Sequence, residues 1–268
     1  MKNLSLPIRK EIMLTRYHLR KRKERAQQII KAKTVIAKDE RFVHLVAVTK
    51  KEYLRAAIRC VNSIWFHSPE IQIVIHIDNQ LSKYQTYLLQ KLDRKDRVSI
   101  QLEESFTSWQ ELKLKVILYE LGERDSFSDA DLYWNIPIPE LESGLYFAAE
   151  KALLDRSPYI EVIQDSGISL ENSSTMANSS FISIGKMPNR AEFVDDVENN
   201  FRKIRLQARE GSYEETVRAK ILRLSEQIAL SISINKQEAH FSPLKSSDKP
   251  MDGGAAESYY LGTTKGWA

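Results

Sequence analysis

Residues 71–77, Ile-Gln-Ile-Val-Ile-His-Ile, place an isoleucine at every second position of a short run. A period of two is typical of a β-strand, and Val74 among the intervening positions indicates burial on both faces. Strands of this kind occur mainly in parallel sheets covered by helices on each side. The stretch therefore predicts an α/β fold, in which His76 is a core histidine with a hydrogen-bond partner.

The flanking sequence alternates further strands with helices. A β-rich run covers residues 42–48, and apolar positions from Leu54 to Trp65 recur at helical spacing. After residue 77 we expect a helix over about 81–92, a strand over 98–102 and a helix over 109–121. Strands that alternate with helices form βαβ units, so the fold class is α/β, with an open, mostly parallel sheet flanked by helices.

The second half of the chain has a less regular pattern. It predicts a helix over 147–154, a strand over 175–184, a helix opened by Pro188 and another helix over about 213–231. From Ser242 the sequence is rich in Ser, Lys, Gly and Pro, which predicts irregular structure. We therefore divide the chain into a basic tail (1–40), an α/β domain (41–243) and an irregular C-terminal segment (244–268).

Charge is distributed unevenly along the chain. Residues 1–40 contain 12 Lys and Arg against 4 Asp and Glu, whereas the rest contains 28 against 32, so the tail carries +8 and the body −4. A nucleic-acid-binding protein would carry its basic residues on the folded face, which argues against nucleic acid as a partner. The sequence also lacks a run of about 18 apolar residues and a secretory signal pattern. Together with the single cysteine, Cys60, these features predict a cytoplasmic protein.

The tail itself predicts a basic helix over residues 8–37. Its apolar residues fall on one narrow stripe at helical spacing, surrounded by lysines and arginines. Three roles stay open: packing on the body or on a second copy, exposure to solvent, or attachment to an anionic membrane surface. Sparse apolar positions between Leu19 and Ile30 favour packing over membrane attachment. The stripe consists of Ile8, Ile12, Leu19, Ala26 and Ile30.

Two aspartates, Asp129 and Asp131, lie about 80 residues into the α/β domain, just past an expected strand end. Open α/β sheets bind ligands at the carboxyl ends of their strands, and paired carboxylates offer the hard oxygen ligands that Mg²⁺ or Mn²⁺ prefers. The pattern therefore predicts a metal site. Plain turn residues are the simplest alternative. A phosphatase with an aspartate nucleophile is another, although its signature expects Thr or Val where this chain has Tyr133.

The order of these segments resembles that of the GT-A-fold nucleotide-sugar glycosyltransferases, particularly the family-8-like group. The resemblance covers roughly residues 42–243. It implies a hexosyltransferase-type enzyme that moves a sugar from a nucleoside diphosphate sugar to the hydroxyl of a glycan or other acceptor, with Mn²⁺ or Mg²⁺ as cofactor. The matching segments are HLVAVTKKEYL (44–54), IQIVIHID (71–78), FSDADLYWNIPIP (127–139), MANSSFISIG (176–185) and SEQIALSISI (225–234).

The resemblance implies that the loop after the first strand, Val48, Thr49 and Lys50, meets the nucleotide base. It further implies that Lys113 or Lys115 approaches the diphosphate or the sugar. These two lysines are two positions apart on a helix, so they cannot both face the site. Solvent-exposed lysines on a charged helix face are the simpler interpretation for each.

Five residues are implied to surround the reacting sugar. Asp129 would contact the ribose or the sugar, and Asp131 would bind the metal. Asn178 and the pair Glu226 and Gln227 would lie near the reacting carbon. The sequence lacks a match for the His and Lys-Pro-Trp elements that often close such sites, which keeps a second function open: a non-catalytic binding or scaffold protein with the same fold.

Overall fold

The computed structural model describes residues 41–47, 51–90, 92, 95–103, 106–132, 134, 137–138, 145–153, 159–170, 175–185, 187–236 and 241–244. The expected N-terminal basic helix and the residues after 244 lie outside these ranges. Within the described part, no helix is long and apolar enough to cross a membrane.

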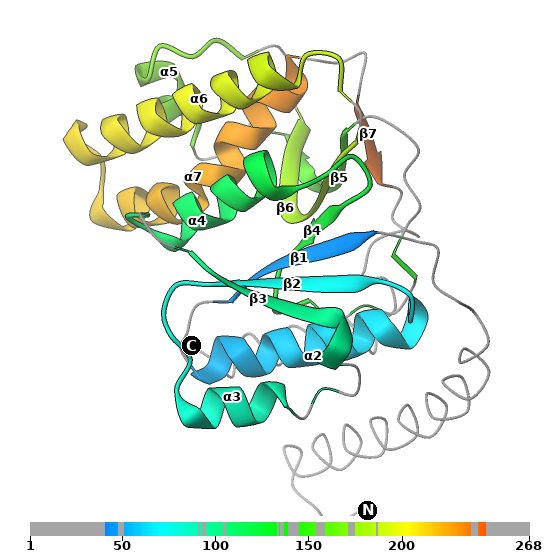
Figure 1. Ribbon diagram of the computed structural model, residues 1–268. Coiled ribbons are helices and arrows are strands. Elements are labelled where there is room, and N and C mark those ends of the chain that lie inside the picture. Colours follow the sequence, from blue (N-terminus) through cyan, green and yellow to red (C-terminus); the bar gives the residue numbers. More distant parts are fainter. Residues whose placement is uncertain are drawn as a thin grey trace, which may run out of the picture.

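A seven-stranded mixed sheet forms the centre of the fold (Figure 1), in the order β3-β2-β1-β4-β6-β5-β7. Neighbouring strands from β3 to β4 are parallel, and so are β5 and β7, whereas β6 is antiparallel to β4 and β5. The expected α/β fold with a mostly parallel sheet is confirmed. The strands are β1 (Phe42–Ala47), β2 (Gln72–Ile77), β3 (Val98–Leu102), β4 (Ser126–Ser128), β5 (Leu145–Leu153), β6 (Thr175–Ile184) and β7 (Phe241–Leu244).

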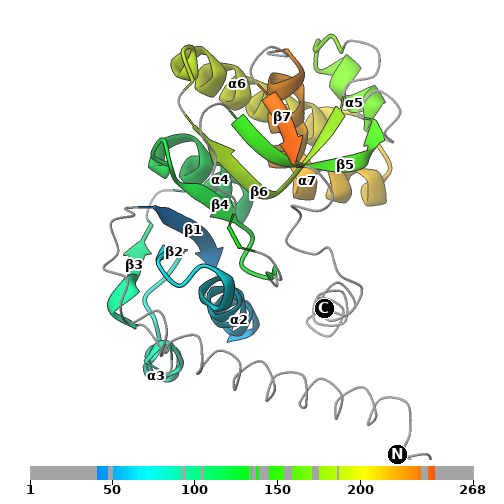
Figure 2. The ribbon, with the colours of Figure 1, turned by 90° about the vertical axis from the view of Figure 1, so that its right-hand side faces the viewer.

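Helices cover the sheet in two groups. In Figures 1 and 2, α2 and α3 lie beside the β1–β3 half, and α4, α6 and α7 gather around the other half. The α-helices are α2 (Lys51–His67), α3 (Lys83–Leu89), α4 (Trp109–Lys115), α5 (Ile160–Asp165), α6 (Arg190–Glu210) and α7 (Glu215–Asn235). A short 3-10 helix, η1 (Lys95–Arg97), precedes β3, and a π-helical turn, η2 (Val116–Glu120), continues α4.

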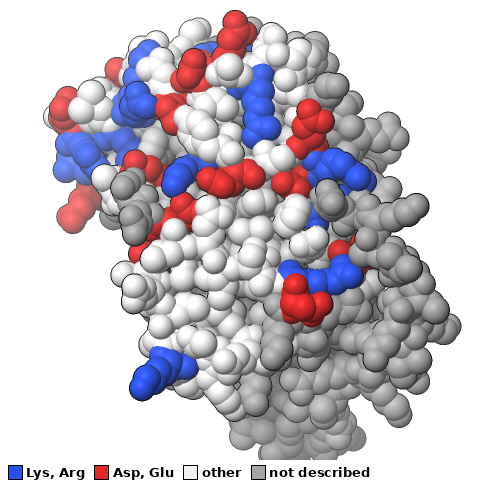
Figure 3. Space-filling view, in the orientation of Figure 1, with Lys and Arg blue, Asp and Glu red and all other residues white. Residues whose placement is uncertain are grey.

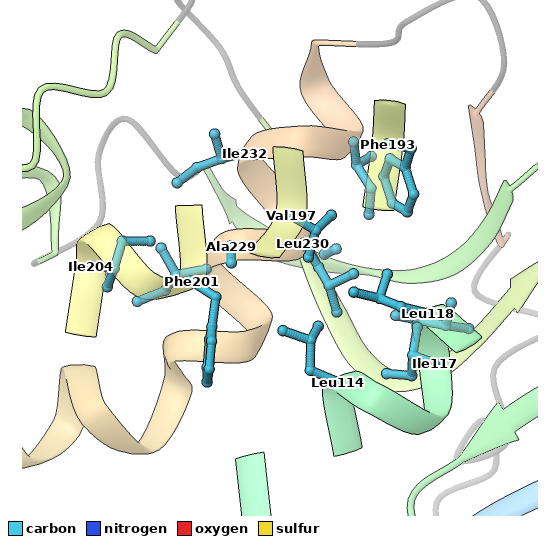
Figure 4. Close-up of a cluster of buried hydrophobic side chains, with 14 of the residues drawn as sticks. Leu114, Ile117, Leu118, Phe193, Val197, Phe201, Ile204, Ala229, Leu230 and Ile232 are labelled. Carbon is cyan, nitrogen blue, oxygen red and sulfur yellow. The ribbon is translucent and has the colours of Figure 1, made fainter. Parts of the chain in front are cut away.

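Two apolar cores match these two groups. In the first, alternate residues of β1 and β2 pack against α2, whose Trp65 is 2% exposed. In the second, apolar residues of α4, η2, α6 and α7 meet against β6 (Figure 4). Burial of apolar area in both cores fixes α4 and α7 against the middle of the sheet. The labelled residues of the second core are Leu114, Ile117, Leu118, Phe193, Val197, Phe201, Ile204, Ala229, Leu230 and Ile232.

The sequence-based expectations failed at two elements. Residues 147–154 were expected to be helical, but Leu145–Leu153 form β5, which pairs with β6 and β7. Alanines in this run favour a helix locally, and pairing with strands from distant segments overrides that preference. The chain end was expected to be irregular from Ser242, but Phe241–Leu244 form β7 as an edge strand that tolerates Pro243.

Charged side chains of both signs intermix over the helical half of the molecule on the face drawn in Figure 3. The surface over β2, β3 and α3 carries few charges on this face. No broad basic patch is visible on this face among the described residues.

A chain of polar side chains crosses the parallel half of the sheet inside the protein. Lys115 Nζ donates to Glu103 Oε2 at 2.7 Å, and Glu103 Oε1 lies 2.7 Å from His76 Nδ1. His76 Nε2 lies 2.9 Å from His44 Nδ1, and His44 Nε2 lies 3.6 Å from Asp125 Oδ2. His76 is therefore the core histidine that the sequence predicted, with partners on both ring nitrogens.

Burial and the neighbouring His44 lower the pKa of His76, although hydrogen bonding to Glu103 opposes the shift. Burial alone would raise the pKa of Glu103, but hydrogen bonds from Lys115 and His76 outweigh it and lower the pKa. An ionised Glu103 accepts a hydrogen bond from Nδ1–H of a neutral His76, whose Nε2 then accepts a hydrogen bond from His44 Nδ1–H. The folded state thus favours one arrangement of protons on Glu103, His76 and His44.

We predict that acidification from pH 7.5 to 5.5 lowers the free energy of unfolding through His76. The unfolded histidine takes up a proton near pH 6.5, whereas the folded one resists protonation, so this stability is complete above 6.5 and is lost as pH falls. The slope contributed by one proton is at most about 1.4 kcal/mol per pH unit. His76→Gln should flatten the slope in urea unfolding measured at several pH values, and the control His67→Gln should keep it. Equal slopes for wild type and His76→Gln would contradict the assignment.

Candidate functional site

The candidate site lies where the parallel strands end. Strands β1, β2, β3 and β4 run in one direction, so their carboxyl ends meet at one edge of the sheet. Asp129 follows β4 directly, and its backbone N–H donates to the carbonyl of Ser180 on β6 at 2.8 Å. Leu132 N–H returns to the Asp129 carbonyl at 3.2 Å and closes a turn that carries Asp131. Both aspartates are partly exposed at this edge.

Buried polar groups support the turn from behind. Ser128, at the end of β4, accepts a hydrogen bond from Trp134 Nε1 at 3.0 Å. Cys60 of α2 lies 3.6 Å from the Asp129 carbonyl, and burial raises the pKa of its thiol. Sequence reasoning missed these residues as site residues. The structure explains the polar Ser128 in this buried strand through its contacts with Trp134 and Cys60.

Lys113 of α4 is the buried cation of the site, with 4% of its side chain exposed. Its Nζ donates to Asp129 Oδ1 at 2.7 Å and to Ser179 Oγ of β6 at 3.0 Å, and it lies 5.2 Å from the centre of the Phe127 ring. Burial alone would lower the pKa of Lys113, but Asp129 and Glu226 outweigh it and raise the pKa. Lys113 therefore stays charged and holds Asp129 in one orientation.

Glu226 of α7 lies on the inner side of this cation. Its Oε1 is 3.7 Å from Lys113 Nζ and accepts from Ser179 Oγ at 3.4 Å, whereas Oε2 is buried without a hydrogen-bond partner. Burial raises the pKa of Glu226, and Lys113 offsets the shift only in part. Burial thus favours the protonated form of Glu226 more than in an exposed glutamate, while Oε1 faces the ammonium of Lys113 and the hydroxyl of Ser179.

Lys115 points elsewhere, as the spacing of two residues on a helix required. Its Nζ binds Glu103 in the polar chain described above, so Lys113 alone of the two lysines faces the aspartate turn. The exposed fraction of the Lys115 side chain is 39%.

The remaining expected residues divide into two groups. Asn178 lies in β6, in register with Ala148 of β5, and Gln227 follows Glu226 on α7 and is 9% exposed. Val48, Thr49 and Lys50 lie outside the described residues, although β1 ends beside them at Ala47. The structure thus brings Lys113, Asp129 and Glu226 into one cluster with Ser179, a contact that the sequence did not predict.

The turn can be compared with the needs of a divalent cation. Mg²⁺ is commonly held by one or two carboxylates, with water and substrate phosphates as further ligands. Asp131 and the Oδ2 of Asp129 fit that donor set, because Lys113 occupies only Oδ1 of Asp129. No cluster of three His, Cys, Asp or Glu side chains that could hold a metal occurs among the described residues. Asp129 and Asp131 therefore suit a cation whose remaining ligands come from water and a bound phosphate.

No protein-family model matches the chain, and no curated protein matches its sequence. Solved structures share its fold. A galactosyltransferase named LgtC, in complex with donor and acceptor sugar analogues, superposes with a TM-score of 0.53 at 10% identity over 76% of this chain and 73% of that one. An active-site variant of LgtC gives 0.52 at 11% identity, with the same coverage. Mouse xyloside xylosyltransferase 1 gives 0.49 at 9% identity over 78% and 86%.

The LgtC comparisons, together with the sheet order and its covering helices, show that the chain has a GT-A-type fold. At 10–11% identity the likeness concerns the fold. The chemistry has to be argued from the cluster at the carboxyl edge.

We predict that Glu226→Gln keeps the free energy of unfolding within about 1 kcal/mol of wild type, because burial disfavours the charge of Glu226 and an amide keeps its volume and its acceptor for Ser179. Glu226→Ala, which removes the acceptor of Ser179 and opens a cavity, should cost about 2–3 kcal/mol. Urea unfolding at pH 7.5 measures both, with Glu214→Gln at the exposed start of α7 as a control. If Gln destabilises as much as Ala, the charge of Glu226 contributes to stability and the prediction is wrong.

Proposed function

We propose that the protein is a glycosyltransferase that moves a sugar from a nucleoside diphosphate sugar to an acceptor hydroxyl. The observation that carries the proposal is the buried Lys113, fixed by Asp129 at the carboxyl end of β4. A cation beside a partly exposed carboxylate turn suits a ligand that combines phosphates with sugar hydroxyls. The GT-A-type fold supports the same reaction class, since LgtC is described as a galactosyltransferase. Among nucleoside diphosphate sugars, those that carry a hexose are the first donors to test.

We assign a divalent cation, Mn²⁺ or Mg²⁺, to Asp131 and Asp129. When bound, such a cation offsets the negative charge that accumulates on a leaving diphosphate. The protein's own contribution is to fix the two carboxylates. Lys113 orients Asp129, and the hydrogen bond from Leu132 N–H closes the turn that carries Asp131. Preorganised groups of this kind stabilise developing charge without having to move during the reaction.

The other expected residues take supporting roles in the proposal. The loop Val48–Lys50 after β1 would meet the nucleotide base, and Asn178 and Gln227 would line the sugar end of the site. Glu226 acts through Lys113, because its carboxyl is buried against the lysine and Ser179. Lys115 donates to Glu103 in the series of polar side chains that crosses the sheet, and we assign it no role in binding the donor. We place the enzyme in the cytoplasm, with segment 1–40 available to pack on the body or to attach it to an anionic membrane surface.

A non-catalytic binding protein is the second candidate. It is favoured by the pairing of Asp129 Oδ1 with Lys113, which leaves the described residues with few carboxylate oxygens for a cation. Such a protein would bind the nucleotide sugar without breaking its glycosidic bond. Incubation with a panel of nucleotide sugars and Mn²⁺, followed by assay of the released nucleotide, separates the two. Release supports the transferase, and tight binding without release supports the binding protein.

We predict that Asp131→Asn abolishes the Mn²⁺-dependent part of nucleoside diphosphate binding, because the site loses a charged oxygen ligand. Stability should change by less than about 0.5 kcal/mol, since the side chain is partly exposed and its volume is kept. Calorimetric titration of UDP and GDP with and without Mn²⁺ measures the effect. Asp96→Asn, in the 3-10 turn at the opposite end of β3, is the matched control. Unchanged affinity in Asp131→Asn would remove the metal role.

A further inference from the structure

Trp109, the first residue of α4, is a large apolar side chain left accessible beside the candidate site. It is 42% exposed, although it lies on the helix face that is otherwise buried. Residues four positions apart share a helix face, so Trp109 lies above Lys113, about 6 Å nearer the start of the helix. Exposure therefore rises from 3% at Lys113 to 42% at Trp109 within one turn.

The backbone that carries Trp109 is held firmly. Ser108 caps the helix by accepting from Glu111 N–H at 3.3 Å, and the Glu111 carboxylate accepts from Thr107 N–H at 2.7 Å. One position further, Gln110 reaches the Arg223 carbonyl of α7 at 3.5 Å. A reciprocal cap of this kind fixes the first helical turn. The indole is therefore presented from a rigid element.

Trp109 could contact either of two rings of the substrates, the nucleotide base or a sugar. Its position relative to the sheet distinguishes them. Lys113, one turn below it, contacts Asp129 after β4 and Ser179 on β6, and Gln110 contacts α7. Trp109 therefore lies on the β6 and α7 side of the aspartate turn. The proposed base position, after β1, is on the other side of β4 in the sheet order. This placement favours a sugar ring over the nucleotide base as the ring that contacts Trp109.

We propose that Trp109 is the stacking surface for the sugar ring of the acceptor, which identifies the acceptor class as a glycoside. The inference rests on the proposed function, because the donor position defines which side is left for the acceptor. An indole offers a broad apolar face at little cost in side-chain entropy, and the C–H face of a pyranose is its natural complement. Lys113 lies one turn below it and holds Asp129, which the proposed function assigns to the donor.

Kinetics with a panel of methyl glycosides as acceptors test the proposal. Trp109→Ala should raise KM for the accepted glycoside about tenfold with a smaller change in kcat, and Trp109→Phe should recover most of the loss. Tyr119→Ala, which removes an aromatic side chain that is 55% exposed on η2 and bonded to Glu198, is the matched control and should behave as wild type. An unchanged acceptor KM in Trp109→Ala overturns the proposal.

Two further readouts separate this inference from the proposed function. Donor hydrolysis by the wild-type protein without acceptor reports the transferase alone, so its absence counts against the proposed function. Quenching of tryptophan fluorescence by the same glycosides reports the stacking surface directly, and it should be lost in Trp109→Phe. If Trp109→Ala weakens the binding of UDP or GDP and not that of glycosides, the indole is a base platform and the acceptor assignment is wrong.

Discussion

A single ammonium group holds the centre of the molecule together. Lys113 Nζ is buried between Asp129 on the turn after β4, Ser179 on β6 and Glu226 on α7, so one cation joins three elements that are far apart in the sequence. Removing a lysine from water is costly, and only close carboxylates and a hydroxyl can compensate. The requirement that Lys113 be paired therefore fixes the orientation of Asp129, the position of the buried Glu226 and the approach of α7 to the sheet.

The same constraint connects the fold to the proposed chemistry. Asp129 is oriented from inside the protein by Lys113, and Asp131 follows it on the same turn at the carboxyl edge of the sheet. The antiparallel strand β6 supplies Ser179 and the carbonyl of Ser180, which binds Asp129 N–H. The parallel half provides the edge at which ligands bind in α/β sheets, and the antiparallel half provides the wall beside it.

Much of this organisation could be predicted from the sequence, because the strands and helices of the first half have clear periodicity. The isoleucines of 71–77 predicted a buried strand, and the spacing of Lys113 and Lys115 required that only one face the site. The burial of Glu226 beside Lys113 could not be predicted, since it depends on a contact across 113 positions. The strand at Leu145–Leu153 was missed because its pairing partners β6 and β7 come later in the chain.

Anomalous diffraction from crystals soaked with MnCl₂ and UDP tests the central claim most directly. The account predicts one strong manganese peak within coordination distance of Asp131 and of the Asp129 oxygen that Lys113 leaves unpaired, with the diphosphate completing the ion's ligands. Lys113 should keep its contact with Asp129 in the same crystals. A diphosphate bound at this edge without manganese, or a manganese peak away from the aspartate turn, would contradict the account.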